Sequence, residues 1–267
     1  MEMDVKVDLS GRVALVTGST SGMGEAIARA FARSGAIVAL HGLGEAEAIG
    51  NLVDELHCLS GREVAYFDHD LTDAENGDRL VDEVIRKYGR LDILVNNAGI
   101  QHVSDIADFP PEAWKRVLAV DLSAAFFATR RAVAGMRKRG WGRIVNTAST
   151  LGLVAELHKA AYVSAKHGLI GLTRATALDT AEDGVTCNAI CPGWVLTPLA
   201  SRQLDAAAER LELSREETAR DHFLLLQPTR RFVEVDEVAA TALFLCSNAA
   251  ASITGVALPV DGGQMII

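Results

Sequence analysis

Short apolar runs alternate with longer helical patterns along almost the whole chain, and this alternation constrains the fold more than any other feature. The expected strands are continuously apolar, which is typical of strands buried on both faces of a sheet. They cover residues 12–18, 36–40, 63–70, 91–99, 142–149, 185–193 and 255–263. Helical patterns cover residues 24–35, 45–60, 79–89, 111–139 and 161–178. The order predicts an α/β fold: a doubly wound, seven-stranded parallel sheet (Rossmann-type) with helices on both faces.

One segment does not fit this alternation. Residues 198–228 are helical in pattern and rich in charge, and they are too long for a plain strand-to-helix connection. Ligands bind at the carboxyl ends of the strands in such sheets, so we expect a helical substrate lid there. The alternative is a surface decoration. No repeat or linker divides the chain, which predicts a single domain over residues 1–267.

Composition excludes several classes of protein. A net charge of −9 argues against a nucleic-acid partner, and no apolar run approaches a membrane span, so no membrane partner is expected. The first residues lack the apolar core of a signal peptide. The cysteines (Cys58, Cys187, Cys191 and Cys246) show no metal-site spacing, and Cys187 and Cys191 are expected to be small buried residues. These features predict a cytoplasmic protein without a metal site.

A glycine-rich turn follows the first expected strand. The stretch TGSTSGMG, residues 17–24, contains Gly18, Gly22 and Gly24 and leads into a helix. Glycines here let the backbone approach a pyrophosphate, and the helix start offers free N–H groups. Glycine clusters occur in many turns, but this one lies in the first strand–helix–strand unit. The turn is therefore a candidate dinucleotide site.

Three polar residues come at and after the end of the fifth expected strand. Ser149 ends that strand, and Tyr162 and Lys166 stand four residues apart, on one face of a helix. A free tyrosine has a pKa of about 10, and a nearby ammonium lowers the pKa by favouring the anion. Lowering it by about three units requires roughly 4 kcal/mol, which one desolvated cation can supply. Tyr162 is thus a candidate general base, the alternative being a core tyrosine beside a lysine that reaches solvent.

These motifs together resemble the short-chain dehydrogenase/reductase family. TGxxxGxG, NNAG (96–99), an upstream serine and YxxxK occur in the family's order, and the likeness continues to DGG at 261–263. The resemblance implies catalysis by Ser149, Tyr162 and Lys166, with Ser149 holding the substrate oxygen. It implies that Asp70 and Leu71 hold the adenine of a nicotinamide cofactor. The full set of expected cofactor residues is Gly18, Ser21, Gly22, Met23, Gly24, Asp70, Leu71, Asn97, Tyr162, Lys166, Pro192, Gly193 and Val195.

One position departs from the family pattern. The long helix has an apolar stripe through Trp114, Leu118, Asp121 and Ala125, so Asp121 should face inward. In the family this residue is usually an asparagine that completes the catalytic group, and much of its role falls to the backbone carbonyl. Asp121 is therefore expected to serve as a fourth catalytic residue. A buried carboxylate is costly unless it is paired or protonated.

The cofactor is expected to be NAD. Enzymes that prefer NADP place Arg or Lys after the second strand or inside the glycine turn. Here those positions hold HGLG, residues 41–44, and Ser21, with no fixed cation. NAD-dependent enzymes commonly have an Asp at this strand end that binds the ribose hydroxyls, and this chain has none. The absence of a cation for the 2′-phosphate nevertheless favours NAD over NADP.

Within the family, the chain resembles bacterial D-3-hydroxybutyrate dehydrogenases. The shared stretches are NNAGIQHV (96–103), KAAYVSAKHG (159–168) and NAICPGWVLTPL (188–199). This likeness implies oxidation of (R)-3-hydroxybutyrate, whose carboxylate would be bound by Gln101, Lys159 and Gln203, with Ser149 and Trp194 also in the substrate site. Lys159 would be a lone cation among amides, which suits a small monoanion.

Two residues depart from the subfamily and leave alternatives open. Leu151 replaces a carboxylate-site histidine, and Gln264 replaces a residue that is often tryptophan. The first alternative is a dehydrogenase for another small hydroxy acid, polyol or ketone; the second is a dinucleotide sensor without turnover. The helix at 161–178 is small or apolar on several faces, which with the family's habit predicts a homotetramer.

Overall fold

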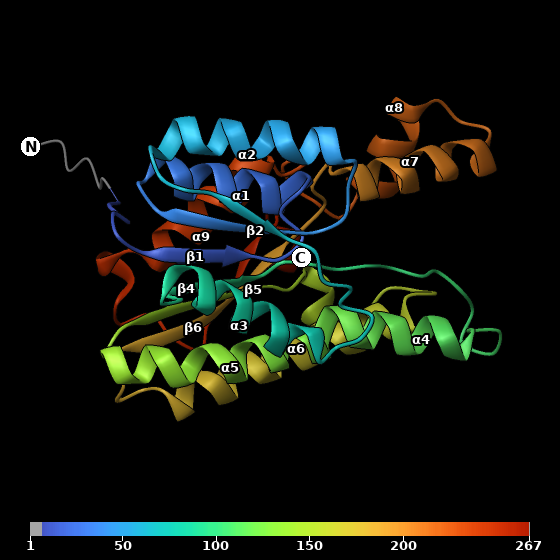
Figure 1. The fold of residues 1–267 in the computed structure, drawn as a ribbon. Helices are drawn as coiled ribbons and strands as arrows, with labels where there is room; N and C mark the ends of the chain where they lie inside the picture. The colour runs from blue at the N-terminus through green and yellow to red at the C-terminus, as the bar shows by residue number, and fades with distance from the viewer. Residues whose placement is uncertain (1–6, 267) are drawn as a thin grey trace, which may run out of the picture.

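A computed structural model describes residues 7–266, and its centre is one parallel sheet (Figure 1). The strand order is β3-β2-β1-β4-β5-β6-β7, and all neighbours are parallel. The strands are β1 (Val13–Val16), β2 (Ile37–His41), β3 (Ala65–Phe67), β4 (Ile93–Asn96), β5 (Gly142–Thr147), β6 (Val185–Pro192) and β7 (Ala257–Val260). The predicted doubly wound, seven-stranded sheet is confirmed. Residues 1–6 and 267, the ends of the predicted domain and the segment searched for a signal peptide, lie outside the described residues.

Helices cover both faces of the sheet. They are α1 (Gly22–Arg33), α2 (Ala46–Ser60), α3 (Asn76–Tyr88), α4 (Pro111–Leu118), α5 (Ala124–Arg139), α6 (Ala160–Asp179), α7 (Pro198–Leu211), α8 (Arg215–Thr218) and α9 (Val235–Cys246). Figure 1 shows α1, α2 and α9 on one side of the sheet and α3, α5 and α6 on the other. The sequence pattern predicts no element at 229–254, where α9 lies. This helix packs on both α1 and the sheet, so it lacks a clear polar stripe.

The continuous apolar character of the strands follows from this layering. Along β1, Ala14 and Val16 face the layer that holds α1, whereas Val13 and Leu15 face the layer that holds α3 and α5. All four side chains are buried, because successive residues of a strand point to opposite faces and both faces are covered. The sheet is thus the shared wall of two apolar cores.

The predicted long helix at 111–139 is interrupted. A π-helical turn, Ala119–Ser123, separates α4 from α5. The extra residue in this turn rotates the stripe, so Asp121 is buried as predicted, whereas Trp114 is exposed and does not share its face. The expectation of one stripe through both residues is wrong. The turn places Asp121 at the edge of the sheet where the strands end.

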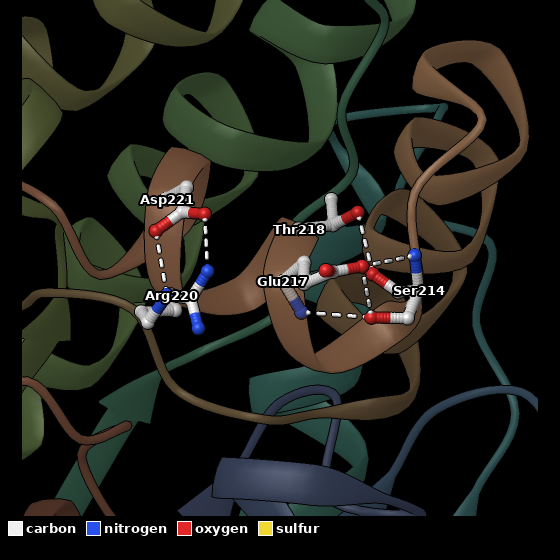
Figure 2. A network of polar contacts seen from close by, with 5 residues as sticks. All are labelled: Ser214, Glu217, Thr218, Arg220 and Asp221. Atoms are coloured by element: carbon white, nitrogen blue, oxygen red, sulfur yellow. Dashed lines mark hydrogen bonds and ion pairs between the residues drawn. The ribbon is translucent and has the colours of Figure 1, made fainter.

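The segment 198–228 is helical, as its pattern predicts. It consists of α7, α8 and a π-helical turn, Ala219–Phe223, and Figure 1 shows α7 and α8 beyond the end of the sheet toward which β1 points. A capping box begins α8: the Ser214 hydroxyl accepts a hydrogen bond from the Glu217 N–H, and the Glu217 carboxylate accepts one from the Ser214 N–H (Figure 2). In the next turn, the exposed side chains of Arg220 and Asp221 form an ion pair. The segment also has a small apolar cluster of its own, in which Leu204, Phe223 and Leu224 are buried.

The strand order creates a crevice in the middle of the sheet. From β1 the chain proceeds outward to β2 and β3, and it then returns to β4 on the other side of β1. The loops after β1 and β4 diverge there, which is where parallel sheets of this kind bind ligands. Among the described residues, no helix is long and apolar enough to cross a membrane.

Candidate active site

The glycine turn between β1 and α1 is closely packed against the end of β4. The side-chain amide of Asn97 donates hydrogen bonds to the carbonyl oxygens of Thr17 and Gly18, at 3.0 and 3.1 Å. A Cβ on Gly24 would lie 2.2 Å from the Gly18 oxygen, so only glycine fits this position. The N-cap residue Ser21 makes no side-chain cap bond, which leaves the first N–H groups of α1 available to an anion.

A cleft of about 620 Å³ extends over this turn. Seven of the predicted cofactor residues line it: Gly18, Ser21, Gly22, Met23, Asp70, Leu71 and Asn97. Gly24 lies beneath the turn, against Gly18. The size of the cleft, the close backbone and the free helix start all fit a dinucleotide. Two arginines that the sequence reasoning missed, Arg116 on α4 and Arg202 on α7, also line the cleft.

A second cavity, of about 110 Å³, adjoins the cleft at Met23, Gln101, Thr197 and Leu199, which line both. It contains every residue predicted to bind substrate and the predicted nicotinamide neighbours: Gln101, Ser149, Lys159, Trp194, Gln203, Pro192, Gly193 and Val195. Tyr162 and both departing residues, Leu151 and Gln264, line it as well. The structure therefore brings the predicted cofactor and substrate residues together, while their roles stay predictions.

Ser149 and Tyr162 come from two adjacent elements. Ser149 follows β5 and caps the short 3₁₀ helix Thr150–Gly152, and its hydroxyl accepts a hydrogen bond from the Leu151 N–H at 3.1 Å. Tyr162 lies in the first turn of α6, and the Lys166 ammonium lies 5.3 Å from the centre of its ring. The expected face shared by Tyr162 and Lys166 is present.

Lys166 is buried and held at both sides. Its ammonium donates a hydrogen bond to the Thr147 carbonyl at 3.0 Å and lies 3.4 Å from Oδ2 of Asp121. Burial alone would lower the pKa of Lys166, but attraction to the Asp121 carboxylate raises it above its ordinary value. Lys166 is thus held as a cation beside the phenol.

Asp121 is an integral part of this group. Its Oδ1 accepts a hydrogen bond from the Ile100 N–H at 2.8 Å, and burial raises the pKa of the carboxyl although Lys166 opposes this effect. A Cβ on Gly99 would lie 3.0 Å from Oδ2, so the glycine of NNAG leaves room for the carboxylate. The sequence suggested a role for the backbone carbonyl of residue 121, whereas the structure shows the side chain itself paired with Lys166.

The predicted lowering of the Tyr162 pKa is wrong for the protein alone. Burial raises the pKa of Tyr162, Lys166 lowers it, and the Asp121 carboxylate raises it again. The prediction counted the cation and omitted both the desolvation of the phenolate and the carboxylate behind the lysine. Additional positive charge next to the phenol is needed to make Tyr162 a base near neutral pH.

Lys159 is the one cation among the described residues that line the cavity, as predicted, but its neighbours are not amides alone. The Lys159 ammonium lies 2.8 Å from Oε1 of Glu156 and 4.8 Å from the centre of the Trp194 ring. Glu156 lines the same cavity, and the sequence reasoning missed it. The opposite charge three residues before Lys159 was the available signal, because the two ends of a four-residue turn lie close together.

The two amides of the predicted carboxylate site bind each other. Gln203, on α7, donates a hydrogen bond to Oε1 of Gln101, and Nε2 of Gln101 is buried without a partner. Trp194 packs against Phe223 at a ring-centre distance of 4.5 Å. Both contacts join the 198–228 segment to the cavity.

Comparisons with known proteins agree with this geometry. Residues 18–265 match the family model described as Enoyl-(Acyl carrier protein) reductase. D-beta-hydroxybutyrate dehydrogenase from Cupriavidus necator is 48% identical, over 96% of this chain and 98% of the relative. The protein of that name from Rhizobium meliloti is 46% identical, over 94% and 98%. The solved structure of a single-residue variant of actinorhodin polyketide ketoreductase with NADPH is similar at a TM-score of 0.87 and 39% identity, covering 95% of this chain and 97% of that one.

Proposed function

The chain belongs to the short-chain dehydrogenase/reductase family of oxidoreductases, and from this premise we propose that it oxidises (R)-3-hydroxybutyrate to acetoacetate with NAD. The observation that carries the proposal is the cavity in which Lys159, Gln101 and Gln203 lie together with Ser149 and Tyr162. A small hydroxy acid offers a carboxylate to the first group and a hydroxyl to the second. The similarity to two D-beta-hydroxybutyrate dehydrogenases supports the same substrate.

Each catalytic residue has a task that follows from its surroundings. Ser149 positions the substrate hydroxyl, and the Tyr162 phenolate removes its proton as general base. Lys166 stabilises the phenolate, and Asp121 holds Lys166 in its charged form and in place. The bound nicotinamide would accept the hydride from the carbinol carbon. The 198–228 segment would cover the substrate and exclude water.

The preference for NAD rests on the end of β2. His41 is buried there, and burial lowers its pKa, so its ring is neutral near pH 7. Its Nδ1 accepts a hydrogen bond from the Gly18 N–H, and Nε2 donates to the His69 carbonyl at 2.8 Å. A ring committed to these two contacts offers no charge to a 2′-phosphate. We expect kcat/KM with NAD to exceed that with NADP by at least about tenfold, or roughly 1.4 kcal/mol; equal values would contradict this interpretation.

The test of the reaction is the appearance of NADH absorbance with (R)-3-hydroxybutyrate and purified protein. The S enantiomer serves as the control substrate. Tyr162→Phe should lower kcat by at least about a hundredfold, because it removes the phenolic oxygen that acts as the base and keeps the rest of the side chain. Wild-type protein that gives no NADH with this substrate would overturn the proposal, and a variant that keeps a tenth of the activity would remove Tyr162 from the role of base.

A second candidate is a dehydrogenase for another small hydroxy acid, polyol or ketone. Leu151 gives the cavity an apolar side chain where the subfamily has a donor, and Glu156 neutralises Lys159, so the cavity also suits a neutral substrate. A screen of NADH formation over small polyols and hydroxy acids separates the candidates. NADH formation with any of these substrates would exclude a sensor without turnover.

We also propose that the protein is a cytoplasmic homotetramer. Exposed small residues on the outer face of α6, Ser164, Gly171 and Ala175, leave room for a helix of a second copy. Leu178, at the end of the same helix, is 80% exposed. Pairing of α6 with another subunit would cover this face.

A further inference from the structure

Glu156 and Lys159 form an ion pair with unequal partners. The Lys159 side chain is 7% exposed, whereas the Glu156 side chain is 43% exposed. Lys159 is confined by the Trp194 ring beside its ammonium, while Glu156 comes from the short irregular stretch before α6. Glu156 can therefore move into solvent at little cost, and Lys159 cannot.

The position of Glu156 coincides with the place that a substrate carboxylate needs. Both Glu156 and Lys159 line the substrate cavity, and the described salt bridges give Lys159 no other partner. The nearby amides, Gln101 and Gln203, are neutral and bind each other. A carboxylate that enters the cavity therefore competes with the Glu156 carboxylate for the same ammonium.

From this arrangement we infer that Glu156 is a specificity-determining residue, a resident counter-ion that leaves Lys159 when a substrate carboxylate binds. The inference rests on the proposed carboxylate site. Half-exposed ion pairs are weak, so displacement reduces the affinity for a monoanion by only about two- to fivefold. Glu156 also keeps Lys159 neutralised when the cavity is empty, which avoids an unpaired cation in a largely buried position.

The test measures binding of propionate to the purified protein by isothermal titration calorimetry. Glu156→Gln keeps the shape and removes the charge, and we expect it to bind propionate about two- to fivefold more tightly than wild type does. Glu112→Gln is the matched control, because Glu112 lies 2.8 Å from Lys115 at the same spacing but on the exposed surface of α4. This variant should bind propionate as wild type does. Butanone, a neutral probe of similar size, should bind equally to all three proteins.

Unchanged or weaker propionate binding in Glu156→Gln would overturn the inference and make Glu156 a residue that positions Lys159. An equal gain for propionate and butanone would also overturn it, because the change would then be in shape rather than charge. If Glu156→Gln does not fold, Glu156→Asp, with its carboxylate one methylene farther from the ammonium, should shift propionate binding in the same direction by less. Propionate binding is measured without turnover. If the wild-type protein does not oxidise 3-hydroxybutyrate, the proposed function is overturned, and the propionate measurements still test the role of Glu156.

Discussion

Two lysines reach the same site with carboxylate partners, and the two pairs differ in burial. The inner pair, Lys166 and Asp121, is separated by 3.4 Å, with side chains 4% and 0% exposed. The outer pair, Lys159 and Glu156, is shorter at 2.8 Å, but Glu156 is 43% exposed. Distance alone would rank the outer pair first, whereas burial makes the inner pair the one that cannot separate.

The difference in burial suits the two roles proposed for these lysines. A lysine that stabilises a phenolate needs a constant position and a constant charge, and a fully buried partner supplies both. A lysine that binds a substrate anion needs a partner that another carboxylate can replace. The same two residue types thus form a fully buried pair in one place and a half-exposed pair in the other.

The largest expected effect comes from breaking the inner pair. Lys166→Met should lower kcat by about a thousandfold or more, because the phenolate loses its cation. It should also lower the free energy of unfolding by about 3–5 kcal/mol, since the Asp121 carboxylate is left buried without its cation. Denaturant unfolding and NADH formation measure the two effects.

A double variant separates stability from activity at the inner pair. Adding Asp121→Asn to Lys166→Met removes the unpaired charge and should recover most of the lost stability with no recovery of kcat. If the free energy of unfolding of the double variant stays as low as that of Lys166→Met, the unpaired Asp121 charge is not the cause of the lost stability. If activity returns, Lys166 is not required for catalysis.

Breaking the outer pair at its lysine should have a smaller effect that depends on the substrate. Lys159→Ala should lower kcat/KM for (R)-3-hydroxybutyrate by about thirtyfold or more, or ~2–5 kcal/mol, because the carboxylate loses its cation and meets Glu156 instead. A neutral secondary alcohol should lose far less. Adding Glu156→Gln should restore part of the lost activity, and equal losses for both substrates would contradict a carboxylate site.

The smallest effect on kcat is expected from Asp121→Asn, which keeps the Lys166 cation and removes only the carboxylate behind it. We expect kcat to change by less than about tenfold. The Asp121 carboxylate raises the pKa of Tyr162, so its removal should lower that pKa. The rising limb of kcat against pH should therefore move to lower pH. A limb that moves to higher pH, or a hundredfold gain in kcat, would show that Asp121 acts differently.

Much of the fold and part of the site could be predicted from the sequence. The alternation of strands and helices specified the layered sheet, because local periodicity reflects which faces are buried. Tyr162 and Lys166 are four residues apart on one helix, so their proximity is a local property. The glycine turn likewise depends on residues adjacent in the chain and on the close approach of Asn97, and five of its eight residues line the cleft.

Only the tertiary structure decided which charges meet. The contact of Asp121 with Lys166 depends on a π-helical turn, and that of Gln101 with Gln203 joins residues 102 positions apart. Burial also determined the direction of the Tyr162 pKa, since the cost of desolvating a phenolate depends on everything packed around it. Spacing along the chain determines which side chains share a face. The packing of separate elements determines their partners, their exposure to water and hence their charge.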